Sequence, residues 1–178
     1  MFPFPVKLIH FTHIDNLLKI KNGGLILDQK SRKLQNVNAI AMSGSDTRKL
    51  CEFNIPYEEI ISNKCLEAYG VYFRVYPIDA NITIYDIREF KNPSLVCGLV
   101  FNESILNDFP WHLNLCENNG FYIYDDLRAP FCGGNLKKSY DSTTISLLKQ
   151  SDLDPTQFEL VIRSNVPLVG YMSSIINF

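Results

Sequence analysis

The sequence predicts an α+β fold in a single domain spanning residues 1–178, with an N-terminal helix packed on an antiparallel sheet. Two observations support this fold class: many short stretches rich in aromatic and β-branched residues, and only a few stretches with helical periodicity. Turn signals such as "NPS" and "ENNG" separate the strand candidates. These candidates are "VKLIHF", "YGVYFRVYP", "ITIYDI", "SLVCGLVF", "GFYIYDD" and the stretch "QFELVIRSNVPLVGYM".

Helices are predicted where a capping residue precedes apolar periodicity. The segment "HIDNLLKIKN" is expected to form a short helix that is closed by Gly23 and Gly24. "NESILNDFP", with Asn102 as its cap and Pro110 as its stop, and "STTISLLKQ" are expected to form two more. A further short helix is expected in "IPYEEIISNKCLEA". Residues 29–50 are polar with little periodicity, which indicates a long loop or a loop with a helical turn.

Composition argues against several classes of protein. No apolar run approaches the roughly 18 residues that a membrane helix needs, and the N-terminal stretch lacks the basic region and cleavage site of a signal peptide. The five cysteines form no CxxC pair, and their odd number argues against a disulfide framework. We therefore expect reduced thiols, a cytoplasmic location and no membrane association.

The net charge of −2 is unevenly distributed along the chain. Residues 1–50 carry eight Lys and Arg against three Asp and Glu, which gives +5, whereas residues 51–178 carry nine against sixteen, which gives −7. A basic stretch of this kind is consistent both with a solvated face and with a patch that binds phosphates. Its cations gather at Lys30, Arg32, Lys33, Arg48 and Lys49.

The stretch "IHFTHIDN" places His10, His13 and Asp15 close together, which raises the question of a metal site. Zinc needs three or four converging ligands, and neither His112 nor the scattered cysteines stand at a recognisable spacing. We therefore expect no metal. The GxSxG, P-loop and GxGxxG motifs are absent as well, so the sequence offers no support for a serine hydrolase or a common nucleotide-binding loop.

The same stretch also has the pattern of a helix start. Thr12 is expected to be the N-cap, with Asp15 three residues later in a capping box. Capping leaves His10 and Asn16 unexplained. Exposed backbone N–H groups at such a start can bind an anion or an amide, so a ligand role for the junction stays open.

A second polar pair lies near the C-terminus in "DPTQFELVIR". Gln157 and Glu159 are two residues apart, and residues i and i+2 of a strand share one face. Both side chains are therefore expected to project into the same space. An ordinary edge strand with outward polar residues gives the same pattern, so the pair alone does not identify a function.

Taken together, the two stretches resemble the DarT family of ADP-ribosyltransferases. The strand "YGVYFRVYP" and the segments "LVFNESIL" and "FYIYDDL" also follow the family's order, so the resemblance spans nearly the whole chain. Leu18 stands where the family usually has proline. The matching residues are His10, Thr12, His13, Ile14, Asp15, Asn16, Leu17, Gly23, Gly24 and Leu25, followed by Gln157, Glu159, Leu160, Val161, Val166, Pro167 and Leu168.

The resemblance implies an ADP-ribosyltransferase-like fold with a split, curved antiparallel β-core and NAD in its cleft. It implies transfer of ADP-ribose from NAD, without a metal, to a base of single-stranded DNA, usually thymine or guanine. It also implies a toxin that acts as a monomer and is paired with an antitoxin that removes the modification as an ADP-ribosyl hydrolase.

The resemblance gives Glu159 the catalytic role, because a carboxylate can stabilise the positive charge that develops at the ribose C1′. Gln157 would hydrogen-bond the incoming base, since its amide offers donors and an acceptor. Arg48 would bind the pyrophosphate, with Arg74 as the competing choice. Lys49 would contact the backbone of the nucleic acid.

The remaining family positions would hold NAD. Backbone groups at His10 would meet the nicotinamide amide, and Thr12, His13 and Asn16 would hold the adenosine-side ribose or a phosphate. Tyr72 would stack on nicotinamide or on a base, although an aromatic residue in this strand is also consistent with a simple core position.

Two alternatives remain open at this point. The first keeps the fold and NAD but has RNA or protein as the acceptor, which the acidic remainder of the chain leaves open. The second is a catalytically silent binding module of the same fold, which would neither turn over nor bind NAD.

Overall fold

The computed structural model describes residues 2–27, 71–88, 90, 92–109, 111–117, 120–122, 148–155, 158–162 and 164–178. For residues 112–117, 120–122, 152, 158 and 159 it describes the backbone. The loop expected at residues 29–50 and the helix expected in "IPYEEIISNKCLEA" lie outside these residues, as does most of "STTISLLKQ".

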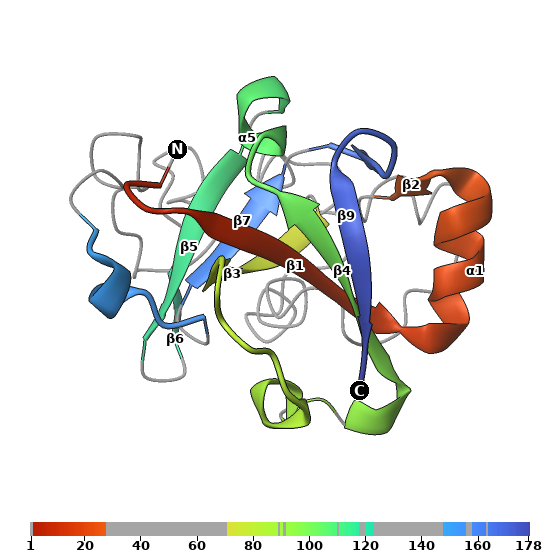
Figure 1. Cartoon of the computed structure of the whole chain (residues 1–178), viewed down its shortest axis with the longest axis horizontal. Helices are drawn as coiled ribbons and strands as arrows, with labels where there is room; N and C mark the ends of the chain where they lie inside the picture. Colours follow the sequence, from red (N-terminus) through yellow and green to blue (C-terminus); the bar gives the residue numbers. More distant parts are fainter. Residues whose placement is uncertain are drawn as a thin grey trace, which may run out of the picture.

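The described residues form an antiparallel sheet with one main helix, which confirms the predicted α+β class (Figure 1). Seven strands are hydrogen-bonded in the order β6-β5-β7-β3-β1-β4-β9, and every adjacent pair is antiparallel. They are β1 (Val6–His13), β3 (Val71–Pro77), β4 (Val96–Asn102), β5 (Trp111–Glu117), β6 (Gly120–Tyr122), β7 (Phe158–Ile162) and β9 (Met172–Asn177). Two short strands, β2 (Leu25–Ile26) and β8 (Val166–Pro167), pair separately.

The sheet is split between β1 and β3. Their pairing covers only four positions, from Val6 opposite Pro77 to Ile9 opposite Arg74. Beyond that point β1 continues along β4 to His13, whereas the start of β3 pairs with β7. We call the four paired positions the seam. The expected split antiparallel core is therefore present in the chain's own strand pairing.

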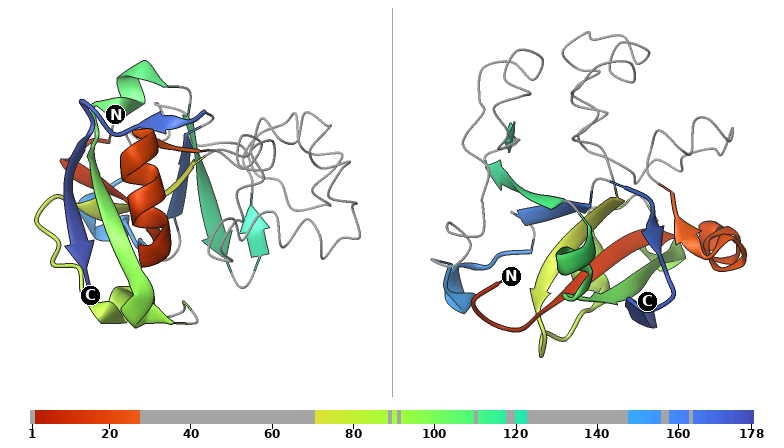
Figure 2. Two further views of the ribbon diagram at one scale, coloured as in Figure 1. Left: turned by 90° about the vertical axis from the view of Figure 1, so that its right-hand side faces the viewer. Right: turned by 90° about the horizontal axis from the view of Figure 1, so that it is seen from above.

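The predicted N-terminal helix is confirmed as α1 (Ile14–Gly23). Gly24 closes it in the left-handed region at φ 65°, where its backbone N–H bonds to the carbonyl of Lys21. Glycine reaches this conformation without a Cβ penalty, which is why the Gly23–Gly24 signal located the end of the helix. Figures 1 and 2 show α1 beyond the end of β1, next to β2 and β4.

The second predicted helix is shorter than expected. It is α5 (Ile105–Asp108), and its N-cap is Ser104 rather than Asn102, because Asn102 still belongs to β4 and pairs with Lys7. Within the described part of the chain, no helix is long and apolar enough to span a membrane.

The strand expected in "ITIYDI" is wrong. Residues Ile84–Ile87 form a single 3-10 turn, η2, because the Asp86 carboxylate accepts hydrogen bonds from both the backbone N–H and the hydroxyl of Thr83, at 2.7 and 3.0 Å. This local capping box outcompetes a sheet partner. The other short 3-10 segments are η3 (Pro93–Leu95) and η5 (Gln150–Asp152).

Alternating residues of the central strands build two apolar cores, one on each face of the sheet. The larger core includes Leu8, Val71, Phe73, Val75, Leu99, Phe101, Ile105, Leu160 and Ile162. The smaller core includes Ile9, Phe11, Tyr76, Ile87, Val96 and Val100. Each large side chain that is fully buried contributes roughly 1.5–3 kcal/mol. The central strands, which carry the candidate residues, are therefore the best-anchored part of the described chain.

Candidate functional site

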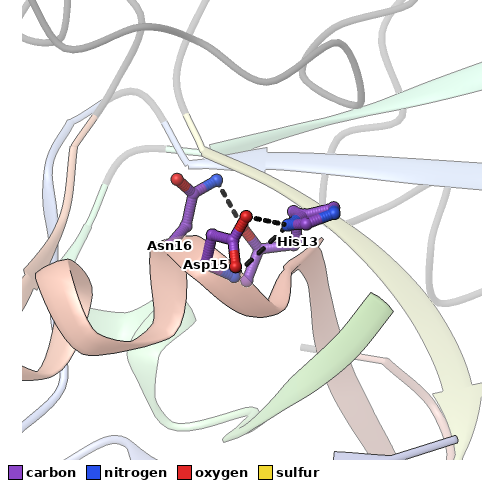
Figure 3. Close-up of polar contacts among 4 residues, drawn as sticks. His13, Asp15 and Asn16 are labelled. Atoms are coloured by element: carbon purple, nitrogen blue, oxygen red, sulfur yellow. Dashed lines mark hydrogen bonds and ion pairs between the residues drawn. The ribbon is translucent and has the colours of Figure 1, made fainter. Parts of the chain in front are cut away.

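The junction of β1 and α1 is organised by His13. His13 is both the last residue of β1 and the N-cap of α1, and its Nδ1 accepts the backbone N–H of Asp15 at 3.3 Å (Figure 3). The Asp15 carboxylate lies 3.3 Å from the same nitrogen. The predicted cap at Thr12 is wrong by one residue, because β1 remains paired with β4 through Thr12 opposite Cys97 and His13 opposite Val96.

Thr12 instead supports Asn16. The Thr12 hydroxyl is almost fully buried, with 6% of the residue exposed, and it accepts a hydrogen bond from Nδ2 of Asn16 at 3.3 Å (Figure 3). Asn16 is only half-buried on the first turn of α1. Asn16 is therefore the more accessible of the two side chains for a ligand, and the hydrogen bond to the buried Thr12 hydroxyl orients its amide.

His10 bridges the split in the sheet. Its Nδ1 lies 2.8 Å from the carbonyl oxygen of Tyr72, and its ring meets the Phe73 ring edge-on with centroids 5.8 Å apart. A carbonyl oxygen can only accept, so Nδ1 carries the proton and the neutral ring has its lone pair on Nε2. His10 therefore joins β1 to β3 just past the last backbone pair of the seam.

Tyr72 lies on the same face of the sheet as Arg74 and Glu159. Tyr72 pairs with Val161, and Arg74 pairs with Glu159. Because Tyr72 and Arg74 are two residues apart on β3, these two cross-strand pairs lie on the same face of the sheet as neighbours. Diagonal neighbours of this kind are about 7–8 Å apart, within reach of an aromatic side chain. The structure thus brings the predicted stacking residue next to the predicted catalytic position.

Glu159 occupies the centre of the sheet rather than an edge. Its backbone in β7 pairs with Arg74 of β3 on one side and with Asn114 of β5 on the other. The edge-strand alternative for the "Q-x-E" pair is therefore wrong for this position. Gln157, Arg48 and Lys49 lie outside the described residues, so their predicted roles remain predictions.

His10 and Glu159 lie on opposite faces of the sheet, on the two strands that flank β3. Ile9, Arg74 and Glu159 form one row, so His10, the next residue of β1, alternates to the other face. The positions predicted to hold NAD and to cleave it therefore lie on the two strands that flank β3, and they alternate to opposite faces of the sheet.

Arg74, the competing candidate for the predicted arginine, is firmly held. Its Nη1 donates to the carbonyl oxygen of Asp86 at 2.6 Å, and its guanidinium lies 5.6 Å from the centre of the Phe11 ring and 5.4 Å from that of Phe90. The guanidinium also acts on Tyr76: burial raises the pKa of the Tyr76 phenol, and Arg74 opposes that rise. Sequence reasoning missed this setting, because it depends on strand pairing and on the η2 turn.

The described residues contain no group of three or more His, Cys, Asp or Glu side chains that could hold a metal ion. Cys97 is a buried free thiol, and burial raises its pKa. The chemistry that these residues can offer therefore comes from hydrogen-bonding and charged groups: a capped helix start, a bridging histidine and a carboxylate position beside an arginine.

Sequence comparison identifies one matching family and one viral relative. The family "Family of unknown function (DUF5863)" matches residues 6–177. "Uncharacterized protein 422L" of Invertebrate iridescent virus 6 is 32% identical over 176 residues, which covers 91% of this chain and 80% of the relative.

Among solved structures, the chain is similar to "Thermus sp. 2.9 DarT in complex with NAD+", with a TM-score of 0.47 and 14% identity over 94% of this chain and 79% of that one. It is also similar to "Thermus sp. 2.9 DarT in complex with ADP-ribosylated ssDNA", with a TM-score of 0.45 and 16% identity over 94% and 80% of the two chains.

Proposed function

The chain belongs to the family described as a family of unknown function (DUF5863), and from its own residues we propose that it is an NAD-dependent ADP-ribosyltransferase that modifies a nucleobase of single-stranded DNA. One observation carries this proposal. The two motifs that resemble the DarT family are far apart in the sequence, yet β1 and β7, which carry His10 and Glu159, both pair with β3. This shared neighbouring strand supports the proposal that His10 and Glu159 serve one site.

The reaction begins with cleavage of the bond between the ribose C1′ and the nicotinamide nitrogen. The bonding electrons pass to the pyridinium ring, nicotinamide leaves as a neutral molecule, and positive charge develops on the ribose. The carboxylate of Glu159 stabilises that charge and accepts a hydrogen bond from the ribose 2′-OH. A ring nitrogen of the base then bonds to C1′ and releases its proton to solvent.

The β1–α1 junction holds the dinucleotide in this proposal. Asn16 contacts the adenosine-side ribose or a phosphate, and Thr12 orients its side chain. The N-terminus of α1, which His13 caps, contacts the same part of the dinucleotide. The backbone at His10 receives the nicotinamide amide, and Tyr72 stacks beside it. Arg48 remains the candidate for the pyrophosphate.

The acceptor is single-stranded, because a base within a duplex must be flipped out at a cost of a few kcal/mol. Gln157 reads the base, and Lys49 with the neighbouring cations contacts the phosphate backbone. In the cell the protein acts in the cytoplasm as a monomeric toxin, and an ADP-ribosyl hydrolase reverses its product. These assignments rest on the resemblance of the sequence to the DarT family.

The experiment is incubation of the protein with labelled NAD+ and separate pools of single-stranded DNA, RNA and protein, followed by mass spectrometry of the products. We expect a mass increase of one ADP-ribose on DNA oligonucleotides only. Glu159→Gln should reduce transfer by about 100-fold or more, the scale expected on losing a group that stabilises transition-state charge. Asp79→Asn, which changes an exposed acid in the turn after β3, is the matched control and should retain activity.

Three results would contradict parts of this proposal. Undiminished transfer by Glu159→Gln would remove the catalytic assignment. Label on RNA or protein alone would reject DNA as the acceptor, an outcome that the charge of −7 in residues 51–178 makes worth testing. No turnover of NAD+ and no thermal shift with NAD+ would indicate a silent binding module.

A further inference from the structure

One ring nitrogen of His13 makes two contacts with the same residue. Nδ1 lies 3.3 Å from the backbone nitrogen of Asp15 and 3.3 Å from Oδ2 of the Asp15 carboxylate (Figure 3). These contacts require opposite states of Nδ1, because the nitrogen accepts the backbone N–H through its lone pair but donates to the carboxylate only when it carries a proton. The two contacts are therefore alternatives, and the proton on Nδ1 selects between them.

Each state gives the start of α1 a different character. A neutral ring with its proton on Nε2 caps the helix, since Nδ1 then accepts the N–H of Asp15, one of the amides that has no partner within the helix. An imidazolium carries protons on both nitrogens and donates to the carboxylate instead. Protonation thus releases the Asp15 N–H and adds a positive charge at the first turn of α1.

The surroundings allow this exchange without repacking of the core. The side chain of His13 is only 16% exposed, whereas that of Asp15 is 77% exposed. The backbone of His13 is held by the pairing of β1 with β4, opposite Val96. The ring is therefore fixed by its neighbours, and the Asp15 carboxylate can approach it or turn into solvent.

The strands next to His13 bring few other titratable groups to it. The paired position on β4 is the apolar Val96, and the next residue, Cys97, is a buried thiol that stands opposite Thr12. β2 carries no titratable side chain. His10 is three residues earlier on β1 and therefore alternates to the other face.

Asp15 is accordingly the group whose charge acts most directly on the His13 ring in the described part of the chain. Lys19 stands four residues after Asp15, at the spacing of a helical ion pair, yet the structure shows the carboxylate in contact with His13. The partial positive charge of the helix start disfavours an imidazolium, and the Asp15 carboxylate favours it. The charged side chains of α1 are Asp15, Lys19 and Lys21.

We propose that His13 is a proton-controlled switch at the start of α1, in which the neutral ring caps the helix and the protonated ring releases the cap and pairs with Asp15. This inference rests on the proposed function for its link to NAD+, because that function places a part of the dinucleotide at this helix start. The protonated state offers a phosphate a released N–H and a cation, and it compensates the charge of Asp15. NAD+ should therefore bind more tightly as the pH falls, and its binding should draw a proton from solvent.

An NMR titration of the protein without ligand tests the switch itself. The imidazole signals of His13 and the backbone amide of Asp15 are followed from about pH 5 to 8, where histidine side chains commonly titrate. The two should change together. His13→Asn keeps a capping oxygen that gains no proton, so the Asp15 amide should stay constant. Asp15→Asn should need a lower pH for the same change, and Lys19→Met, the matched control on α1, should behave as wild type.

Calorimetry with NAD+ tests the link to the proposed site. We expect the affinity of wild type for NAD+ to be about two- to fivefold higher at about pH 5 than at about pH 8, the scale of one charge at a helix end. Binding heats in buffers with different ionisation enthalpies measure the proton that is taken up. His13→Asn should lose both the pH dependence and the proton uptake, whereas Lys19→Met should keep them.

The outcomes separate the switch from the proposed function. Joint titration of the ring and the Asp15 amide, with tighter NAD+ binding at low pH that His13→Asn abolishes, supports the inference. An Asp15 amide that stays constant while the ring titrates would show that Nδ1 keeps its proton throughout, and it would overturn the switch. NAD+ affinity that is independent of pH, or that falls with the pH, would overturn the link to the ligand. If NAD+ does not bind at any pH, the proposed function fails together with that link, while the titration still decides whether the cap switches.

Discussion

The Nδ1 of His10 lies 2.8 Å from the carbonyl oxygen of Tyr72, immediately beyond the last backbone pair between β1 and β3. A side chain thus takes over where the backbone ladder ends. Because a carbonyl oxygen can only accept, the contact places the ring proton on Nδ1 and leaves Nε2 as a hydrogen-bond acceptor. The bridge also holds β1 and β3 together at this point.

Removal of this bridge should weaken the fold and the binding of NAD+ together. His10→Phe keeps the edge-on packing against Phe73 but cannot donate to Tyr72, and it should lower stability by about 1 kcal/mol. His10→Ala should cost more, because the ring contact is lost as well. Chemical denaturation measures the first effect, and the thermal shift produced by NAD+ measures the second. Wild-type stability in His10→Phe would show that the bridge contributes nothing.

The buried hydroxyl of Thr12 should matter through Asn16. Thr12→Val is close in volume but removes the acceptor of the 3.3 Å bond, and we expect a loss of about 0.5–1.5 kcal/mol together with weaker NAD+ binding. Thr12→Ser keeps the hydroxyl and should retain most of the binding. When Thr12→Val is added to Asn16→Ala, the affinity for NAD+ should not fall further. A further fall in affinity as large as that of Thr12→Val alone would mean that Thr12 contacts the ligand itself.

Gly98 should tolerate no side chain. A Cβ built on it would lie 3.0 Å from Cγ2 of Ile9 and 3.2 Å from a ring carbon of Phe11, in the smaller core. Gly98→Ala should therefore destabilise the fold by about 1–3 kcal/mol through overpacking. Gly23→Ala, where a Cβ meets nothing within 4 Å, is the control and should be neutral or slightly stabilising. Equal effects in the two variants in urea unfolding would disprove this account.

Tyr76 should make stability fall in alkaline solution. Burial is the largest cause that raises the pKa of its phenol above the ordinary 10.0. The unfolded chain therefore loses its proton first, so stability is complete below pH 10 and declines as the pH rises through the folded-state pKa. Tyr76→Phe should flatten this decline, measured as the pH dependence of the unfolding free energy, in a Cys97→Ala background that removes the buried thiol. Tyr85→Phe, at an exposed tyrosine, should leave the decline unchanged.

Local signals in the sequence predicted α1 well. "HIDNLLKIKN" followed by two glycines corresponds to a helix that ends at a left-handed Gly24. The same kind of local reasoning placed the N-cap one residue early, because nothing near Thr12 indicates that β1 stays paired with β4 as far as His13. It also missed β5, although "WHLNLCE" alternates between apolar and polar residues over most of its length.

Long-range pairing was beyond the reach of the sequence. The spacing of Gln157 and Glu159 indicated a shared strand face, but only the register shows that Arg74 is the neighbour of Glu159. Register is set by the burial of whole strands and by the turns that join them. The role of η2 could not be predicted for a related reason. Its Asp86 carbonyl oxygen accepts a hydrogen bond from Arg74, and this contact depends on where β3 lies.

The four-position seam has a consequence for how the protein acquires its site. The strands that carry His10 and Glu159 belong to different halves of the sheet, and only contacts between distant parts of the chain unite them. Such contacts are costly in loop-closure entropy and are slow to form. Local opening at the seam would separate the two halves while leaving each with its own strand ladder. The proposed activity would then be lost before most of the secondary structure is lost. Hydrogen exchange of the backbone amides in the seam would measure this opening directly.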